Sequence, residues 1–417
     1  MDSEILVQTL GPVALGAIFT VSGLLDAEPR WLGRLGFLVA QLAMIYASGF
    51  GSIAALGLVA CMLLGFALCA GRPDSSPRLR IAGVAGFFAL YVLYCVFQKY
   101  LVPLLIMSAA ATGSGALSHA QSVASIIAVV GISYIGFKFI HVYVDYRAGH
   151  IGKLEPLSFL SWLLFFPSIV AGPMQRYQDW QDQFGRRGLT VDEAVWGLRR
   201  VLVGLFMKVA IADNIHALTL PSMSSGTLVT APWVSIVAAS MIYSLYLYFD
   251  FSGYCHIAIG TGVFWGIRLP ENFNNPYIAR NLMEFWNRWH ITLSEILRDY
   301  LFYPLSFSLK RSPRFRKWPS LTTALPPLIT FLLAGIWHGA GVTYALYGSI
   351  HGVGLAYIAL RRRRRQPHAG MGIGSEKSAV RHWCSVAFTF AYVTFSFVFF
   401  SMPMDKLEVL GNRLIGR

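Results

Sequence analysis

The chain is built from one apolar run after another, and each run is roughly as long as a bilayer is thick. The runs cover residues 5–24, 35–50, 52–71, 82–107, 121–144, 156–173, 195–215, 229–248, 321–337, 342–360 and 383–402. In lipid every backbone polar group needs an internal partner, so spanning segments are helices or closed barrels. The runs are continuous and do not alternate, which excludes a barrel. We therefore expect an all-α polytopic membrane protein with about eleven transmembrane helices.

The composition agrees with this expectation and limits the class of partner. Only 13% of the 417 residues are charged and 55% are hydrophobic, whereas soluble domains carry about 25% charged residues. The net charge is +14. Lys and Arg collect in the cytoplasmic loops of membrane proteins and contact anionic lipid heads there, so we expect membrane lipid and no nucleic acid as partner.

Basic clusters predict which loops face the cytoplasm. The clusters are Arg72, Arg78 and Arg80; Lys310, Arg311, Arg314, Arg316 and Lys317; and the run Arg361–Arg365. By the positive-inside rule all three face the cytoplasm, and counting spans back from the first places the N-terminus outside. We expect one membrane-embedded domain over 1–417, with a cytoplasmic basic linker at 361–380 and a last span and tail at 381–417.

Neither a signal peptide nor a cysteine framework is expected. The first run starts with acidic residues, Asp2 and Glu4, instead of the positive start of a signal peptide, and is predicted to be a retained span. Every cysteine lies in or beside an apolar run, and none forms a Cys-x-x-Cys pair, which predicts neither disulfides nor zinc; they are Cys61, Cys69, Cys95, Cys255 and Cys384.

One region breaks the pattern of spans. Residues 245–303 mix aromatic side chains with charged ones and contain the turn-forming stretch Pro270 to Pro276. The region is too polar for helices that face lipid and too aromatic for an ordinary solvent loop. Irregular backbone at membrane depth persists only inside protein or along a wet cavity, so short re-entrant or interfacial helices are predicted here.

His338, in LLAGIWHGAG, is the sharpest candidate for chemistry. It follows an apolar run, and ionisable groups inside membrane segments are functional candidates by default. A neutral imidazole can accept a proton from a hydroxyl near neutral pH. The flanking glycines permit close approach of a helix or a substrate. The alternative is a structural histidine bonded to a carbonyl, and the periodicity does not separate the two.

His290, in FWNRWHITLSEILRDY, is the second candidate, with a structural role as its alternative. If this segment is helical, Trp286 and His290 share a face because they are four residues apart. Arg288 is then four residues from Glu284 and can pair with it. No Gly-x-Ser-x-Gly, Walker loop, dinucleotide fingerprint or HExxH occurs. The sequence therefore lacks the motifs of the common hydrolase, NTPase and oxidoreductase classes.

Other polar residues receive structural roles. His351 follows His338 by 13 residues, which is roughly 220° around a continuous helix. The two rings are then predicted to point apart, unless a glycine kink intervenes, and His351 is predicted to pack. Asp250 and Tyr254 are four residues apart and are predicted to hydrogen-bond. His141 and Asp145 have the spacing of a metal pair, but without a third ligand nearby we expect no metal.

Several ordered motifs resemble the membrane-bound O-acyltransferase family, in its bacterial branch of alginate O-acetylation and teichoic acid D-alanyl transfer. They are FFPSIVAGPMQRYQDW, YLYFDFSGYCHIAIG, LPENFNNPYI, FWNRWHITLSEILRDYLFYPL and GIWHGAG…YGSIHG, spread over about 131–360. The resemblance implies a helical body around a central funnel, an essential His338 and a His290 that faces the same cavity. We assign substrate binding to five further motif residues, Trp286, Arg288, Trp289, Asp250 and Trp337.

The resemblance also implies the chemistry and the partners. Acyl groups come from a thioester, either acyl-coenzyme A or a phosphopantetheine carrier protein, with no tightly bound cofactor. In the bacterial branch the group crosses the cytoplasmic membrane, usually to an extracytoplasmic partner. The chain departs from the alginate type, because SFSLKRSPRFRK replaces the usual Gly-Gly-Asn stretch. FWNRWH is nearer the D-alanyl type, whereas LPENFNNPY is nearer the alginate type. The acyl group, acetyl or D-alanyl, and the acceptor polymer both stay open.

The expected mechanism is direct acyl transfer. His338 acts as general base toward the acceptor hydroxyl, and His290 positions the acceptor or donates a hydrogen bond to the oxyanion. The basic cluster Lys310–Lys317 follows the WNRWH segment and is predicted to receive the donor beside the active site, or alternatively only to fix topology. The rival functions are a transporter or flippase of a lipid-linked envelope precursor, which would favour paired broken helices, and a structural scaffold.

Overall fold

A computed structural model describes most of the chain from residue 132 onward and parts of the N-terminal third. The described residues are 12–18, 30–47, 132–152, 154–185, 188–339, 341–365 and 379–416, with isolated positions between 85 and 101. Every regular element within these ranges is helical. The predicted span 52–71, the first basic cluster, residues 366–378 and three cysteines (Cys61, Cys69 and Cys95) lie outside the described residues.

Three helices of the described part are long and apolar enough to cross a membrane: α13 (Trp233–Phe264), α17 (Pro319–His338) and α19 (Ala379–Ser401). They confirm helices at the predicted runs 229–248, 321–337 and 383–402. The run 342–360 also lies in one helix, α18 (Val342–Arg365), which continues through the arginine run that was predicted to begin a linker. A number of spans near eleven stays a prediction.

Two sequence predictions about spans are wrong. The run 156–173 contains only α8 (Pro156–Leu163) and the 3-10 turn η2 (Phe166–Ser168), because Pro167 and the positive φ of Gly172 turn the chain. Eight residues of α-helix rise only about 12 Å. Conversely, residues 245–264 were predicted to be re-entrant, yet they continue α13 without a break. Broken helices begin only after Pro270.

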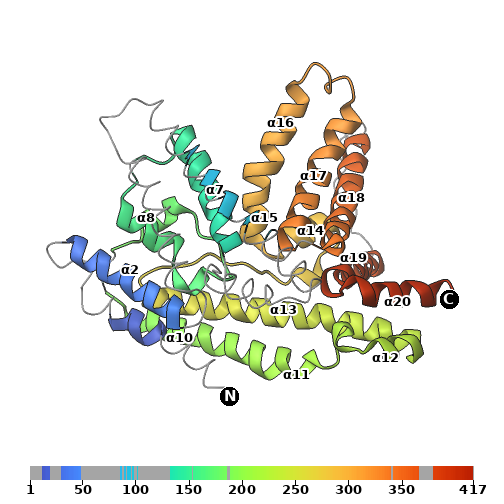
Figure 1. Cartoon of the computed structure of the whole chain (residues 1–417), viewed down its shortest axis with the longest axis horizontal. Helices are drawn as coiled ribbons and strands as arrows, with labels where there is room; N and C mark the ends of the chain where they lie inside the picture. The colour runs from blue at the N-terminus through green and yellow to red at the C-terminus, as the bar shows by residue number, and fades with distance from the viewer. Residues whose placement is uncertain are drawn as a thin grey trace, which may run out of the picture. The chain divides into compact units, whose positions relative to one another are not determined.

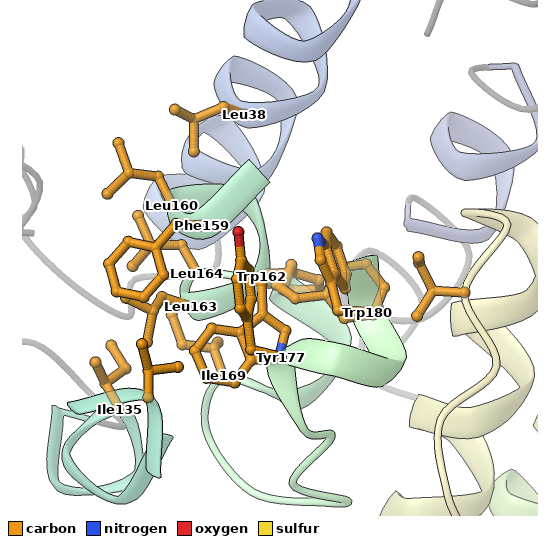
Figure 2. Close-up of a cluster of buried hydrophobic side chains, with 14 of the residues drawn as sticks. Leu38, Ile135, Phe159, Leu160, Trp162, Leu163, Leu164, Ile169, Tyr177 and Trp180 are labelled. Carbon is orange, nitrogen blue, oxygen red and sulfur yellow. The ribbon is translucent and has the colours of Figure 1, made fainter. Parts of the chain in front are cut away.

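The chain divides into two compact units, and unit 1 comprises Met1–Gly204 and Tyr254–Pro270. The elements of its described part, drawn in Figure 1, are α2 (Arg30–Ala47), α7 (Ile132–Ala148), α8, η2, α9 (Tyr177–Gln181), α10 (Val191–Leu205) and the C-terminal part of α13. Its core is aromatic: the Trp162 and Tyr177 rings, drawn in Figure 2, meet edge to face with centroids 5.3 Å apart. The FFPSIVAGPMQRYQDW motif therefore builds this core.

Unit 2 comprises Leu205–Gly253 and Glu271–Arg417 and contains both candidate histidines. Its further elements are η3 (Phe206–Ala212), α11 (Asp213–His216), η4 (Leu220–Ser222), α12 (Ser225–Thr230), η5 (Pro276–Ile278), α14 (Leu282–Trp286), α15 (Ile291–Leu297), η6 (Arg298–Phe302), α16 (Tyr303–Arg311), α17, α18, α19 and α20 (Met404–Leu414). Of these, η3 and η6 are π-helical. The segment between Pro270 and Tyr303 thus has the short helices that its sequence predicted.

Helices α17 and α18 lie side by side in unit 2 because glycines remove the side chains between them (Figure 1). A Cβ on Gly348 would lie 2.2 Å from the carbonyl oxygen of Phe331, and a Cβ on Gly335 would lie 2.2 Å from that of Tyr344. Arg363 Nη1 donates to Thr323 Oγ1 at 3.2 Å, so the end of α18 lies next to the beginning of α17. The two helices are antiparallel neighbours.

Candidate active site

Two sequence motifs are joined by their backbones in unit 2. Asn274 N donates to the carbonyl of Arg288 at 2.9 Å, and Ile291 N donates to the carbonyl of Asn272 at 3.0 Å. The LPENFNNPY loop thus runs along the WNRWH turn. Because both bonds are between main-chain groups, the geometry of the turn that presents His290 depends on the loop that carries Asn272.

His290 occupies a strained backbone position in this turn. Its φ of 43° and ψ of 53° are left-handed, a conformation that a residue with a Cβ rarely adopts. Helix α14 therefore ends at Trp286 and α15 begins at Ile291, so the predicted helical face shared by Trp286 and His290 is wrong. Strained non-glycine residues cluster at functional sites, where the surrounding structure holds them.

The hydrogen bonds of Asn272 define the tautomer of His290. Thr292 N and Oγ1 both donate to Asn272 Oδ1, at 3.1 and 2.9 Å. A backbone N–H can only donate, so the atom facing it is the amide oxygen. His290 Nδ1 lies 3.2 Å from the same oxygen and therefore carries the proton. In the neutral ring, Nε2 is then a hydrogen-bond acceptor.

The surroundings of His290 favour this neutral ring. Its exposed fraction is 5%, and the Phe251 ring packs edge-on against it with centroids 4.8 Å apart. Burial lowers the pKa of His290 to about 3, and the neighbouring His338 lowers it further. The ring therefore stays uncharged at physiological pH. Both candidate histidines belong to unit 2.

His338 is the last residue of α17, and aromatic rings surround it. Its ring centroid lies 4.7 Å from Trp337, 5.2 Å from Phe400 and 6.1 Å from Tyr347. Gly339 ends the helix, and a Cβ there would lie 2.1 Å from the ring of Tyr344, so only glycine fits. His338 and Trp337 are half-buried, whereas the sequence predicted a buried His338.

His351 is fully buried, and both of its ring nitrogens are used. Trp286 Nε1 donates to His351 Nδ1 at 3.3 Å. Ser396 Oγ donates to the Val393 carbonyl at 2.7 Å, and it accepts from His351 Nε2 at 2.8 Å. His351 thereby ties α18 to α14 and α19, which supports the packing role predicted for it.

The predicted orientation of His351 away from His338 rested on a continuous helix, and that premise is wrong. Helix α17 ends at His338 and α18 begins at Val342. The ring of Tyr347 contacts both histidines, with centroid distances of 6.1 and 4.8 Å. One aromatic side chain of α18 therefore lies between the two imidazoles.

The other assigned residues of the WNRWH turn support its shape. Arg288 Nη2 pairs with Glu284 Oε1 at 3.1 Å, as predicted, and its Nη1 donates to the Asn274 carbonyl at 3.1 Å. Trp289 is buried and stacks on Phe285, with ring centroids 5.5 Å apart. Trp286 bonds to His351. The assignment of these three residues and of Trp337 to substrate binding stays a prediction.

The predicted hydrogen bond between Asp250 and Tyr254 is wrong. The Asp250 carboxylate pairs with Lys208, while the Tyr254 hydroxyl donates to the Pro167 carbonyl at 3.4 Å. Lys208 lies in the π-helix η3, and π-helical turns are frequent at functional sites. Sequence reasoning missed Lys208, although a lone lysine in the apolar run 195–215 was a usable signal. It also missed Asn272, which no spacing rule distinguishes from Asn274 or Asn275.

His141 and Asp145 brace the core of unit 1. His141 Nε2 accepts from Tyr177 N at 3.0 Å, and its Nδ1 lies 3.3 Å from Asp145 Oδ2. The same carboxylate oxygen accepts from Gln178 Nε2 at 2.7 Å. The pair therefore fastens α7 to α9, and no group of three or more His, Cys, Asp or Glu side chains suited to a metal ion occurs among the described residues.

The two basic clusters that the structure describes lie far from His338 along α17. Lys310–Lys317 ends two residues before the helix starts at Pro319, and the Arg363–Thr323 bond brings the arginine run to the same end. His338 is at the other end, about 28 Å away at 1.5 Å per residue. The prediction that the lysine and arginine cluster lies beside the active site is therefore wrong.

Comparisons with known proteins agree with these motifs. The family model of the membrane-bound O-acyltransferases matches residues 87–371. Over 289 residues the chain is 35% identical to a probable alginate O-acetylase of Pseudomonas fluorescens, covering 68% of this chain and 52% of that protein. A peptidoglycan O-acetyltransferase of Helicobacter pylori is 36% identical, with coverages of 58% and 44%. A teichoic acid D-alanyltransferase of Bacillus subtilis is 32% identical, with coverages of 54% and 57%. The chain spans about half the length of these relatives.

Proposed function

The chain belongs to the membrane-bound O-acyltransferase family, and we propose that it transfers an acyl group from a thioester to a hydroxyl of a cell-envelope polymer. The relatives named above act on alginate, peptidoglycan and teichoic acid, and they are named as O-acetylases or as a D-alanyltransferase. We extend their class of reaction, acetyl or D-alanyl transfer, to this chain. The proposal places it as a multi-pass protein in the cytoplasmic membrane, with about eleven spans around a funnel.

One observation carries the proposal: His338, in the same unit as His290, stands at the end of α17 that is remote from the Lys310–Lys317 cluster and the arginine run. Basic loops stay in the cytoplasm. A cytoplasmic thioester then enters at the basic end, and the acceptor hydroxyl reaches the histidines from the other side. This arrangement supports modification of an extracytoplasmic polymer and hand-over to an extracytoplasmic partner.

In the proposed reaction His338 is the general base. Its imidazole removes the proton of the acceptor hydroxyl as the oxygen attacks the thioester carbonyl. The new C–O bond forms, the C–S bond breaks, and the leaving thiolate takes the proton from the His338 imidazolium, which restores the neutral ring. General base catalysis contributes roughly 10²–10⁴-fold, so the holding of the acceptor by His290 and of the donor by its binding site must supply much of the remainder.

The donor is a free co-substrate in this proposal, either acyl-coenzyme A or a phosphopantetheine carrier protein. Arg314, Arg316 and Lys317 are exposed near the start of α17 and would attract the phosphates of such a donor or an acidic carrier. The acyl thioester must then extend along the protein to His338. Entry at the basic end and reaction at the far end are thus separate steps.

The test uses purified protein in nanodiscs, with acetyl-coenzyme A or a D-alanyl carrier protein as donor. Fragments of alginate, peptidoglycan and teichoic acid serve as acceptors. We expect one pairing to release free thiol and acylated product, and His338→Ala to abolish both. His150→Ala is the matched control, because the His150 side chain is 71% exposed in the other unit and should leave the rate unchanged. Full transfer by the His338→Ala protein would refute the role of His338. Transport of a lipid-linked precursor without acylation would favour a flippase.

A further inference from the structure

We propose that Asn272 is a positioning residue, which holds His290 protonated on Nδ1 so that its Nε2 accepts a hydrogen bond from a hydroxyl of the acceptor. This inference rests on the proposed function for the identity of the substrate, but its statement about the imidazole concerns this chain alone. It removes one of the two roles predicted for His290, because an unprotonated Nε2 cannot donate to an oxyanion.

The orientation of the Asn272 amide is settled by its neighbours. The side chain is 1% exposed, and its Oδ1 accepts from Thr292 N, Thr292 Oγ1 and His290 Nδ1. If the amide were flipped, its NH₂ group would face the N–H of Thr292 and two donors would meet. Thr292 therefore fixes Asn272, and Asn272 in turn fixes the proton of His290.

The backbone adds a second, independent constraint on His290. The left-handed conformation of His290 is maintained by the bond from Ile291 N to the Asn272 carbonyl and by the Ser294 N–H, which donates to the His290 carbonyl at 3.0 Å. The same residue, Asn272, thus holds both the main chain beside His290 and the imidazole. A left-handed histidine costs stability, and a purely structural turn at this position would be better served by Gly or Asn.

The two buried histidines of unit 2 differ in how many of their ring nitrogens bond to protein groups. Both nitrogens of His351 are bonded to protein groups, Trp286 and Ser396. His290 Nδ1 is bonded to Asn272, whereas Nε2 makes no hydrogen bond to the part of the chain that the structure describes. His290 Nε2 can therefore accept a hydrogen bond from a bound ligand. Its neighbour His338 supplies the base, so a ligand bound at both rings is one that carries hydroxyl groups.

Kinetics with the acceptor that the transfer assay selects provide the first test. Asn272→Ala should raise the KM for the acceptor about five- to tenfold, as expected for one lost neutral hydrogen bond, and should leave the KM for the donor unchanged. Asn274→Ala is the matched control, because it truncates an exposed amide in the same loop. In a His290→Ala background, Asn272→Ala should add less than about a twofold change. An undiminished effect in that background would show that Asn272 only supports the loop and would overturn the proposal.

The pH profile separates a tautomer effect from a packing effect. Asn272→Asp retains an acceptor oxygen but places a carboxylate beside Nδ1–H, which raises the pKa of His290. Below this new pKa the ring is protonated and Nε2 becomes a donor. Activity of the Asp variant should therefore match the wild type at high pH and fall as the pH is lowered, with a limb that the wild type and Asn272→Ala lack. A profile identical to that of the wild type would contradict the proposal.

A spectroscopic test does not depend on the proposed function. The protein with ¹⁵N-labelled histidine in nanodiscs should show His290 with a protonated Nδ1 and an unprotonated Nε2 at neutral pH, assigned by comparison with His290→Ala. In Asn272→Ala the ring should shift toward the other tautomer. If the wild-type ring carries its proton on Nε2, the inference fails even if acyl transfer is observed. If the tautomer is as stated but no acceptor is acylated, the proposed function fails instead.

Discussion

Substitutions of His351 test whether this histidine serves helix packing or takes part in the reaction. It is fully buried and joins three helices through Trp286 on α14 and Ser396 on α19. His351→Ala removes a complete ring, and large-to-small core changes of aromatic residues typically cost about 3–5 kcal/mol. It also leaves the Trp286 N–H without its acceptor. Hydrogen bonds between membrane helices contribute about 0.6 kcal/mol on average and about 1.7 at most. We therefore expect a loss of about 4 kcal/mol, most of it from the cavity.

Two further substitutions at this position separate the terms. His351→Phe fills the space but offers neither nitrogen, so it should lose only the polar part, about 1–2 kcal/mol. His351→Gln carries an amide oxygen that can accept from Trp286 and an amide N–H that can donate to Ser396. It should therefore fall between the wild type and His351→Phe. The predicted order of stability is wild type, Gln, Phe, Ala.

The assay is thermal unfolding in one detergent, followed by fluorescence-detected gel filtration, with acyl transfer measured below the transition. His338→Ala is the comparison, because this ring is half-buried and should cost much less stability while abolishing transfer. His351→Gln should retain transfer. A stable but inactive His351→Gln protein would refute the reasoning, since His351 would then be a chemical group and not a brace.

Three other predictions concern helix contacts and charge. Gly348→Ala should destabilise the protein by about 1–3 kcal/mol, because its Cβ would lie 2.2 Å from a carbonyl oxygen of α17, whereas Gly411→Ala, with nothing within 4 Å, should be neutral or slightly stabilising in the same melting assay. Lys208→Ala should lower stability by about 1–2 kcal/mol. This is less than the loss on breaking a fully buried ion pair, because the Lys208 and Asp250 side chains are 32% and 28% exposed. Replacing Asp250 by Leu as well should recover part of the lost stability. Reversing three charges of the Lys310–Lys317 cluster to Glu should raise the donor KM several-fold at low salt and little at high salt; an unchanged donor KM would leave the cluster only a topological role.

The spanning helices were predictable where their apolar runs are long and isolated. The runs behind α17 and α19 are bounded by basic or turn-forming segments, so hydropathy alone located them. The run 156–173 is also apolar, but a hydropathy average does not reveal that Pro167 and Gly172 turn the backbone. In α13 the opposite error occurred: aromatic and polar residues within residues 245–264 resembled a loop, although a helix inside a protein buries such residues without interruption.

The candidate site was predictable in its residues and not in its geometry. His338, His290 and Arg288–Glu284 follow from motif and spacing. The orientation of His351 and the partner of Asp250 did not, because spacing rules assume a regular helix. A turn separates His338 from the helix of His351, and a π-helix shifts Lys208 into reach of Asp250. The tautomer of His290 depends on an amide 18 residues earlier in the chain, and only the fold brings those two groups together.

The position of His338 also bears on which reactant moves under the proposed function. The arginine run and the Lys310–Lys317 cluster meet at one end of α17 and α18, and His338 lies about 28 Å away along α17. A polymer that stayed outside would need no path through the protein, because the histidines stand at the end of α17 away from the basic loops. A thioester that stayed at the basic surface could not reach them. The acyl group must therefore be carried along the helix on an extended arm. Under the proposed function, donor entry and proton removal thus take place at opposite ends of α17.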